Sequence, residues 1–449
     1  MDLPNTPPFA IRARILTPLA AGGTEHLPDG VVVVDEKGVI VSVGAAADAA
    51  PEVVASAIDL RPWVVLPGMV DTHAHLPQLP NAGLGFALDL LTWLEHVTFP
   101  TERSWSDPEV AQRLAPVIFQ AFAAAGTTTV LGYGTVYAAA MDAVFAAAEQ
   151  HGIRAILGKV MMDRGTYDPI IEPSTILERS LRESADLISR WHGADDGRLG
   201  YAVTPRFAVS CSAEMLRESA SLARETGTWW QTHVSEDPGE IAEVRRLFPE
   251  ARDYVDVYDR AGGLGKRAVL AHAIHLSDRE LARLIETGTR VAHCPASNLF
   301  IGAGVMPLAR YLDAGLAVGL GSDVSGGPEA SIFSVMRVGA YALMARRSFA
   351  REEGPVLDPL DWLRMGTLAG AQALGLDATI GSLEAGKEAD LIAVDPSFAA
   401  ALPSSPADDD PRDLMSRLIF RAHPDIVRGA WVRGRRLDGP GRHAMAAAS

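Results

Sequence analysis

The chain has 449 residues, of which 48% are hydrophobic and 21% are charged, and its formal net charge is -16 at pH 7. This acidic balance argues against nucleic acid and anionic membranes as partners, and no apolar run reaches the roughly 20 residues that a membrane-spanning helix needs. The two cysteines, Cys211 and Cys294, form no CxxC motif and no disulfide framework, which fits a reducing compartment. We therefore expect a cytoplasmic protein.

The two ends of the chain predict one small β domain. Residues 11–16, 31–34 and 39–43 are strand candidates, and a hairpin signal at 35–38 joins the last two. Short β-rich runs return near the other end, at 389–394 and 426–432. We expect these runs to join the first strands in a small β-sandwich domain.

Between these ends, strands alternate with helices. The strand candidates are 67–75, 126–131, 153–160, 199–204, 229–234, 268–273, 289–293 and 317–322. Eight such units in series predict an α/β fold with a closed (β/α)8 barrel of the TIM type. A doubly wound open sheet is the alternative, but no GxGxxG motif opens a helix after a strand. We expect the barrel at 67–374 and the small domain at 1–66 and 375–449.

The first barrel strand ends in two histidines, His73 and His75, one residue apart. Residues i and i+2 of a strand point to the same face, so the two imidazoles should project side by side. This geometry suits two ligands of one metal ion. Taken alone, the pair fits equally well a strand that happens to close with two histidines.

Other strand ends carry the same kinds of side chain. His233 ends the fifth strand, His272 the sixth, and Asp323 follows the eighth. Each alone is more often structural, but strand ends meet at one rim of a barrel, where active sites lie. Imidazoles and a carboxylate suit zinc, and iron would also fit. Since the fourth strand ends in Thr-Pro-Arg, without a lysine to bridge a second ion, we expect one metal per chain.

Glu236 lies three residues after His233. A carboxylate there can move a proton between water and a ring nitrogen. The alternative is a glutamate in the first turn of a helix, where the helix dipole favours a negative charge. The adjacent metal ligand favours the proton shuttle.

Five stretches resemble the amidohydrolase superfamily. They are DTHAHLPQ at 71–78, LTWLEHVTFPTE at 91–102, TPRFAVSC at 204–211, HCPASNLFIGAG at 293–304 and IGSLEAGKEADL at 380–391. The second and third are the most specific, and they resemble the guanine-deaminating members. Two regions depart from the pattern. They are the loop after Asp323, with Pro328 and Glu329, and the stretch between Val160 and Gly200, which does not align with it.

The resemblance implies zinc-dependent hydrolysis of guanine to xanthine and ammonia by a homodimeric enzyme of purine catabolism. The metal ligands would be His73, His75, His233 and Asp323, and the catalytic residues would be Glu236, His272 and Asp323. Gln78, Arg206 and Phe207 would hold the purine. A guanidinium suits a carbonyl, a glutamine suits a ring edge, and an aromatic ring can stack on a heterocycle. By residue type alone, Phe207 is better read as a core residue.

Three rivals remain open. The first is a deaminase of another amino-heterocycle on the same fold, such as 8-oxoguanine, a pterin or an s-triazine. The second is a two-metal cyclic amidase. The third is a non-catalytic scaffold, which the full set of predicted ligands disfavours.

Overall fold

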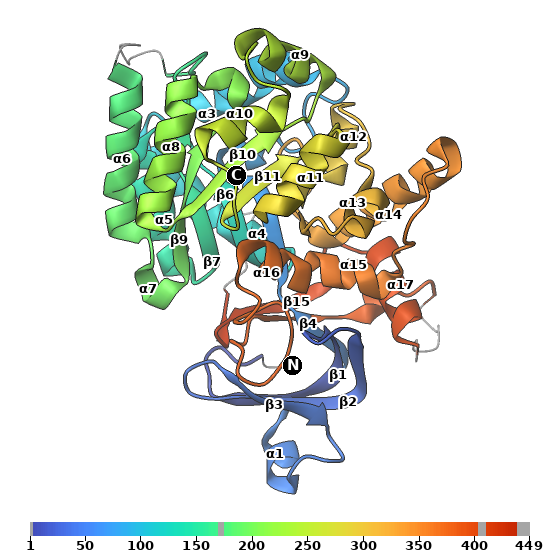
Figure 1. Ribbon diagram of the computed structural model, residues 1–449. Helices are drawn as coiled ribbons and strands as arrows, with labels where there is room; N and C mark the ends of the chain where they lie inside the picture. Colours follow the sequence, from blue (N-terminus) through green and yellow to red (C-terminus); the bar gives the residue numbers. More distant parts are fainter. Residues whose placement is uncertain (1–2, 169–174, 403–409, 438–449) are drawn as a thin grey trace.

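The computed structural model describes residues 3–168, 175–402 and 410–437. A barrel fills the upper part of the molecule in Figure 1 and a separate sheet lies below it. Within the described ranges, no helix is long and apolar enough to cross a membrane. The prediction of an α/β fold with a barrel is confirmed.

Eight parallel strands form a nearly closed barrel. In chain order they are β5 (Met69–His75), β6 (Thr127–Tyr133), β7 (Arg154–Gly158), β9 (Leu199–Pro205), β10 (Trp229–Val234), β11 (Ala268–His272), β12 (Arg290–His293) and β13 (Val318–Leu320). Each neighbouring pair from β5 to β13 is parallel. All eight lie at the predicted places, and a two-residue strand, β8 (Val160–Met161), pairs with β9 beyond the end of β7.

The first and last strands are joined by hydrogen bonds rather than by a regular ladder. The amide of Asp323 donates to the carbonyl oxygen of His73 (2.8 Å), and the amide of His75 donates to that of Val324 (3.0 Å). The carboxylate of Asp71 accepts from the amides of His73 (3.1 Å) and Ser322 (3.0 Å). These bonds bring the segment after β13 against β5. The strand β13 itself is shorter than the predicted 317–322.

Helices cover the outside of the barrel, as Figure 1 shows. The longer ones are amphipathic, and in α6 the buried positions recur every three or four residues from Ile176 to Ile188. Two helices, rather than one, lie between β10 and β11. The helices after the strands are α4 (Pro108–Ala124), α5 (Ala138–His151), α6 (Ile176–Trp191), α7 (Ala194–Gly197), α8 (Ala213–Thr226), α9 (Pro238–Leu247), α10 (Tyr254–Ala261), α11 (Asp278–Thr287), α12 (Pro295–Phe300), α13 (Leu308–Asp313), α14 (Ile332–Ala345), α15 (Pro359–Gly366) and α16 (Leu368–Leu374).

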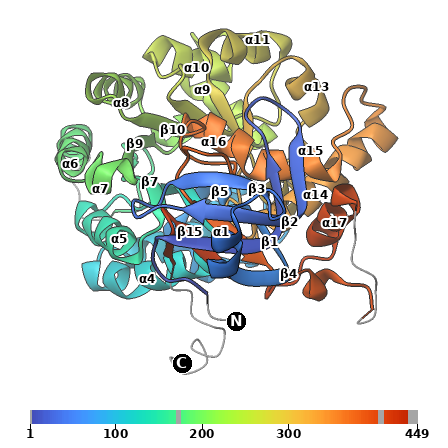
Figure 2. The same cartoon turned by 90° about the horizontal axis from the view of Figure 1, so that it is seen from below.

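Both chain ends build the second sheet, as predicted for the small β domain. Its seven strands, in spatial order, are β16 (Arg435–Arg436), β15 (Val427–Val432), β14 (Leu391–Val394), β4 (Ile58–Pro67), β1 (Phe9–Pro18), β2 (Thr24–Val34) and β3 (Ile40–Ala45). All pairs are antiparallel except β1 with β4. The sheet has a hydrophobic core of its own. Figure 2, from below, shows the strands of both ends together, with α1 (Pro51–Ser56) beside them.

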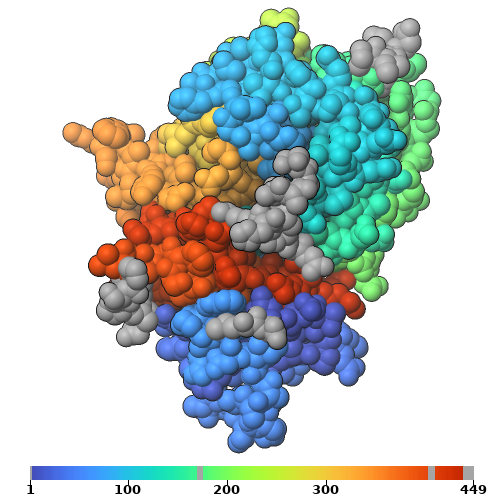
Figure 3. Space-filling model, turned by 180° about the vertical axis from the view of Figure 1, so that it is seen from behind, coloured from blue at the N-terminus to red at the C-terminus, as the bar shows by residue number. Residues whose placement is uncertain are grey.

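The two ends also lie together on the surface. Figure 3 shows the first strands (dark blue) directly beneath the C-terminal segments (red), which include α17 (Pro411–Phe420). A buried ion pair between Arg154 of β7 and Asp390 (Nε to Oδ2, 3.0 Å) fastens the barrel to the segment leading into β14. The exact boundaries at 66/67 and 374/375 stay predictions.

Candidate active site

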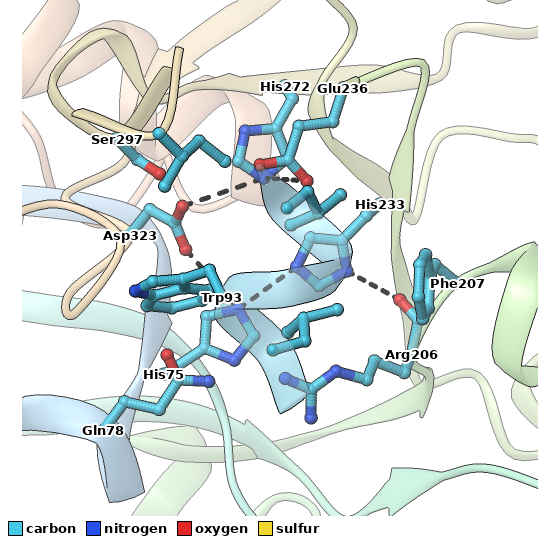
Figure 4. A pocket seen from close by; sticks show the side chains of 13 residues that line it. His75, Gln78, Trp93, Arg206, Phe207, His233, Glu236, His272, Ser297 and Asp323 are labelled. Carbon is cyan, nitrogen blue, oxygen red and sulfur yellow. Dashed lines mark hydrogen bonds and ion pairs between the residues drawn. The ribbon is translucent and has the colours of Figure 1, made fainter. Parts of the chain in front are cut away.

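The predicted side chains meet at one end of the barrel. His73 and His75 come from β5, His233 from β10 and His272 from the end of β11, while Asp323 lies three residues beyond β13. All five are at least nine-tenths buried. Figure 4 shows most of them turned toward a common point.

Short distances join these side chains. Nε2 of His73 lies 3.1 Å from Oδ1 of Asp323, and Nε2 of His75 lies 3.4 Å from the same oxygen. Nε2 of His75 and Nε2 of His233 are 3.1 Å apart. Nε2 of three histidines and one carboxylate oxygen thus converge on the same point. The cluster therefore resembles a ligand set more than a hydrogen-bond network.

The spacing and the donor atoms fit a metal ion. Ligands at about 2.05 Å from a tetrahedral zinc are about 3.3 Å from one another, and the three distances above range from 3.1 to 3.4 Å. Nε2 of His73 is buried, and although it lies 3.1 Å from Asp323 its geometry makes no hydrogen bond. Among the described residues, each candidate group of metal ligands draws on His73, His272 or Asp323. The residues present thus fit one divalent ion.

Electrostatics favours neutral imidazoles at His75 and His233 beside the ionised carboxylate of Asp323. Burial, followed by the charge of His73, lowers the pKa of His75 and of His233 well below the usual value. Burial opposes ionisation of Asp323, but the neighbouring imidazoles, that of His73 first, outweigh it, so the pKa of that carboxyl lies well below its usual range. Neutral imidazole and carboxylate are the forms that bind metal ions.

His272 and Glu236 lie beside this cluster. Nε2 of His272 is 3.8 Å from Oδ2 of Asp323 and 3.4 Å from Oε2 of Glu236. Nδ1 of His272 lies 2.9 Å from the side-chain oxygen of Asn298, which fixes the ring. Burial lowers the pKa of His272 to about 4, and burial followed by Asp323 raises the pKa of Glu236 well above its usual value.

The backbone is strained where two of these groups sit. His272 has φ +72° and Asp323 has φ +48°, in the left-handed region that side chains other than glycine rarely adopt. Such strain collects at functional sites, where the surrounding structure holds it in place. At Asp323, the hydrogen bond from its amide to the carbonyl oxygen of His73 helps to hold this backbone conformation.

A pocket opens over the cluster. Its wall includes the predicted residues Gln78, Arg206 and Phe207, together with Trp93 (Figure 4). Phe207 is buried and its ring centre lies 6.4 Å from that of His233. It therefore belongs to the core and to the pocket wall at once. The other lining residues are His75, Leu90, Leu94, His233, Glu236, His272, Ser297, Ile301 and Asp323.

Arg206 serves the site through both its backbone and its side chain. Its carbonyl oxygen lies 2.6 Å from Nδ1 of His233, which directs Nε2 of that ring toward the cluster. Its guanidinium donates to Oε2 of Glu102 (2.7 Å) and lies over the ring of Phe99, 5.2 Å from its centre. Arg206 is only 2% exposed, so this ion pair is buried rather than on the surface.

Sequence reasoning missed part of the pocket. The segment after β5 folds over it as two short helices, α2 (Leu90–Trp93) and α3 (Phe99–Ser104). They supply Leu90 and Trp93 to the lining and Glu102 behind it. The signal was present, because Glu102 closes the family-like stretch at 91–102. Nothing in that stretch distinguishes a buried glutamate from an exposed one.

The model of the amidohydrolase family matches residues 64–437. The chain belongs to the amidohydrolase family. It is 39% identical over 416 residues to a probable guanine deaminase of Deinococcus radiodurans, covering 90% of this chain and 92% of the relative. These likenesses make the chain a hydrolase that acts on C–N bonds.

Solved structures of the family have the same fold. A guanine deaminase from C. acetobutylicum, with guanine bound in its active site, superimposes with a TM-score of 0.88 at 28% identity, covering 96% of this chain and 100% of that one. An adenosine deaminase from Xanthomonas campestris with bound zinc gives a TM-score of 0.81 at 27% identity, with 99% and 98% covered.

Proposed function

We propose that the protein hydrolyses guanine to xanthine and ammonia, with one zinc ion per chain. The observation that carries the choice of guanine is a pair of groups on one wall of the pocket. Gln78 presents Oε1, a buried acceptor without a protein partner, and Arg206 presents the donors of its guanidinium. Both are held by the same carboxylate, that of Glu102, so they lie side by side.

This pair complements the lactam edge of guanine. The ring N1–H can donate to Gln78, and the neighbouring carbonyl at C6 can accept from Arg206. Adenine has the opposite arrangement, with an acceptor at N1 and a donor at C6. A site built for one pattern leaves buried groups unpaired with the other, which discriminates strongly. Phe207 and Trp93 line the same pocket and offer aromatic faces to a flat ring.

The metal would be held by His73, His75, His233 and Asp323. When bound, a divalent ion there lowers the pKa of a water molecule to about 7. The chain's own groups then move the protons. Asp323, helped by His272 3.8 Å away, takes a proton from the attacking water.

Glu236 completes the reaction on the other side of the amino-bearing carbon. As the water oxygen bonds to C2, Glu236 gives a proton to the ring nitrogen N3. Asp323 then gives its proton to the amino group, and the bond from C2 to the amino nitrogen breaks so that ammonia leaves. The C2 hydroxyl returns its proton to Glu236 and becomes the carbonyl of xanthine. The 3.4 Å contact between Glu236 and His272 places the proton donor beside the residue that assists Asp323.

The test is conversion of guanine followed by ultraviolet absorbance, with ammonia assayed in parallel. We expect xanthine and ammonia in equal amounts and no reaction with adenine. 8-Oxoguanine and a pterin share the lactam edge, and an s-triazine does not, so all three belong in the panel. A higher kcat/KM for any of them than for guanine would replace guanine as the proposed substrate.

The homodimer, the cytoplasmic location and the place in purine catabolism also belong to this proposal. The homodimer rests on the family resemblance and the location on composition. Light scattering of the purified protein tests the first, with a mass of about two chains of 47.7 kDa expected. A mass of one chain would contradict it.

A further inference from the structure

Glu102 lies outside the pocket lining, yet it contacts two residues that line it. It sits on α3, its side chain is fully buried, and it receives Gln78 on one oxygen and Arg206 on the other. Nε2 of Gln78 donates to Oε1 (2.6 Å), and Nη1 of Arg206 donates to Oε2 (2.7 Å). The ring of Phe99, one turn earlier on α3, lies against the guanidinium of Arg206.

This arrangement fixes which end of the Gln78 amide faces the pocket. A carboxylate accepts hydrogen bonds and donates none, so it can bind the Nε2 end only. The Oε1 end is then turned away from Glu102 and is left buried without a partner. Without such a partner, a glutamine amide can rotate to present either end.

We propose that Glu102 is a positioning residue that sets substrate specificity, by holding Gln78 with its acceptor toward the substrate and Arg206 beside it. The inference rests on the proposed function, because it takes the lactam edge of guanine as the group recognised. Glu102 does not touch the substrate. It decides the donor and acceptor pattern that the two residues in front of it present.

A merely structural role for Glu102 predicts something different. A buried ion pair stabilises its surroundings when both partners are present, and loss of one partner destabilises the fold. Such damage lowers activity toward every substrate by a similar factor. A positioning role changes the ratio between substrates whose ring edges differ.

Replacing Glu102 by glutamine makes this difference visible. Arg206 only donates, so it selects the carbonyl end of the new amide. The NH₂ end of the new side chain is then directed at Gln78, which must accept the hydrogen bond through Oε1. The Gln78 amide therefore turns over, and its NH₂ group faces the pocket. The variant presents two neighbouring donors where the wild type presents an acceptor and a donor.

2-Aminopurine is the matching probe, since it keeps the amino group at C2 but has an acceptor at N1 and no carbonyl at C6. The experiment compares kcat/KM for guanine and for 2-aminopurine, which is measured as a competitive inhibitor if turnover is too slow. For Glu102→Gln we expect kcat/KM for guanine to fall at least about 100-fold and kcat/KM for 2-aminopurine to fall less than about tenfold. The kcat/KM for 2-aminopurine divided by that for guanine should thus rise at least about tenfold.

A matched control removes another buried carboxylate that holds an arginine. Asp390 is 3% exposed and pairs with Arg154 far from the pocket lining. Asp390→Asn should lower the midpoint of thermal unfolding and leave the substrate ratio unchanged. Metal content per chain, measured for every variant, should stay at the wild-type value.

A second pair of variants applies if Glu102→Gln fails to fold. Gln78→Glu alone places two carboxylates against each other and should impair guanine turnover. Adding Glu102→Gln restores a donor between the two positions. The carboxylate that replaces the Gln78 amide then offers an acceptor to the pocket in either orientation. We expect the double variant to regain at least about tenfold in kcat/KM for guanine over Gln78→Glu.

Three results would overturn the inference. Equal losses for guanine and 2-aminopurine in Glu102→Gln would make Glu102 structural. No gain in the double variant over Gln78→Glu would show that the two positions are not coupled. If the wild-type protein does not deaminate guanine, the proposed function itself is wrong and the inference falls with it. Failure of the proposed function is thus distinguishable from failure of the inference alone.

Discussion

Replacing Glu236 by glutamine removes an acid while nearly preserving the shape of the side chain. Glu236 is 3% exposed and its Oε2 lies 3.4 Å from Nε2 of His272. Its backbone amide donates to Oε2 of Glu240 (2.9 Å), a bond that the substitution leaves in place. The proposed metal ligands keep their own side chains. The loss should therefore fall on proton transfer alone.

The size of the loss follows from that role. A positioned general acid or base contributes roughly 10²- to 10⁴-fold to a rate, which corresponds to about 3–5 kcal/mol of activation free energy. We expect kcat for guanine to fall by this factor in Glu236→Gln. KM should change little, since the lactam contacts of Gln78 and Arg206 remain.

The assay is the fall of guanine absorbance with ammonia measured in parallel, and the metal content of each sample is determined as well. Glu280→Gln is the matched control, because Glu280 is also buried and caps a helix, α11, without lining the active-site pocket. It should lose stability but keep kcat. Wild-type kcat in Glu236→Gln at full metal content would refute the proton-shuttle role.

Three further predictions concern other parts of the site. Arg206→Ala should lower kcat/KM for guanine about 100-fold or more with the metal retained, because only the backbone of Arg206 holds His233; loss of metal would make the side chain structural. A strong chelator should abolish activity and zinc should restore it, whereas activity that survives complete removal of metal contradicts the ligand assignment. Burial raises the pKa of Glu240 to about 7 from 4.5, so the folded state keeps a proton that the unfolded chain releases, and this contribution to stability is lost as pH rises from about 4.5 to 7. The unfolding free energy of Glu240→Gln minus that of the wild type should thus increase over this range in chemical denaturation, and a flat difference would contradict the shift.

Strand order and the cluster of histidines with Asp323 were predictable because each depends on local pattern. Alternation of apolar strands with amphipathic helices repeats along the chain, and parallel strands bring their ends to one rim. Histidines and an aspartate at those ends were therefore expected to meet, and His73, His75, His233 and Asp323 do. Their roles remain proposals until metal and activity are measured.

The pocket wall was less predictable because it depends on contacts between distant positions. Glu102 is 24 residues from Gln78 and 104 from Arg206 in sequence. The helices that carry this wall are short, four residues in α2 and six in α3, so they leave no periodic pattern. Only tertiary packing decides that Glu102 is buried there.

The most direct test of hydrolytic deamination is the reaction of guanine in water enriched in ¹⁸O. We expect xanthine to gain one ¹⁸O atom, located at C2 by fragmentation in the mass spectrometer, with one ammonia released for each xanthine. Unlabelled xanthine, label at C6, or no xanthine from the zinc-loaded protein would contradict it.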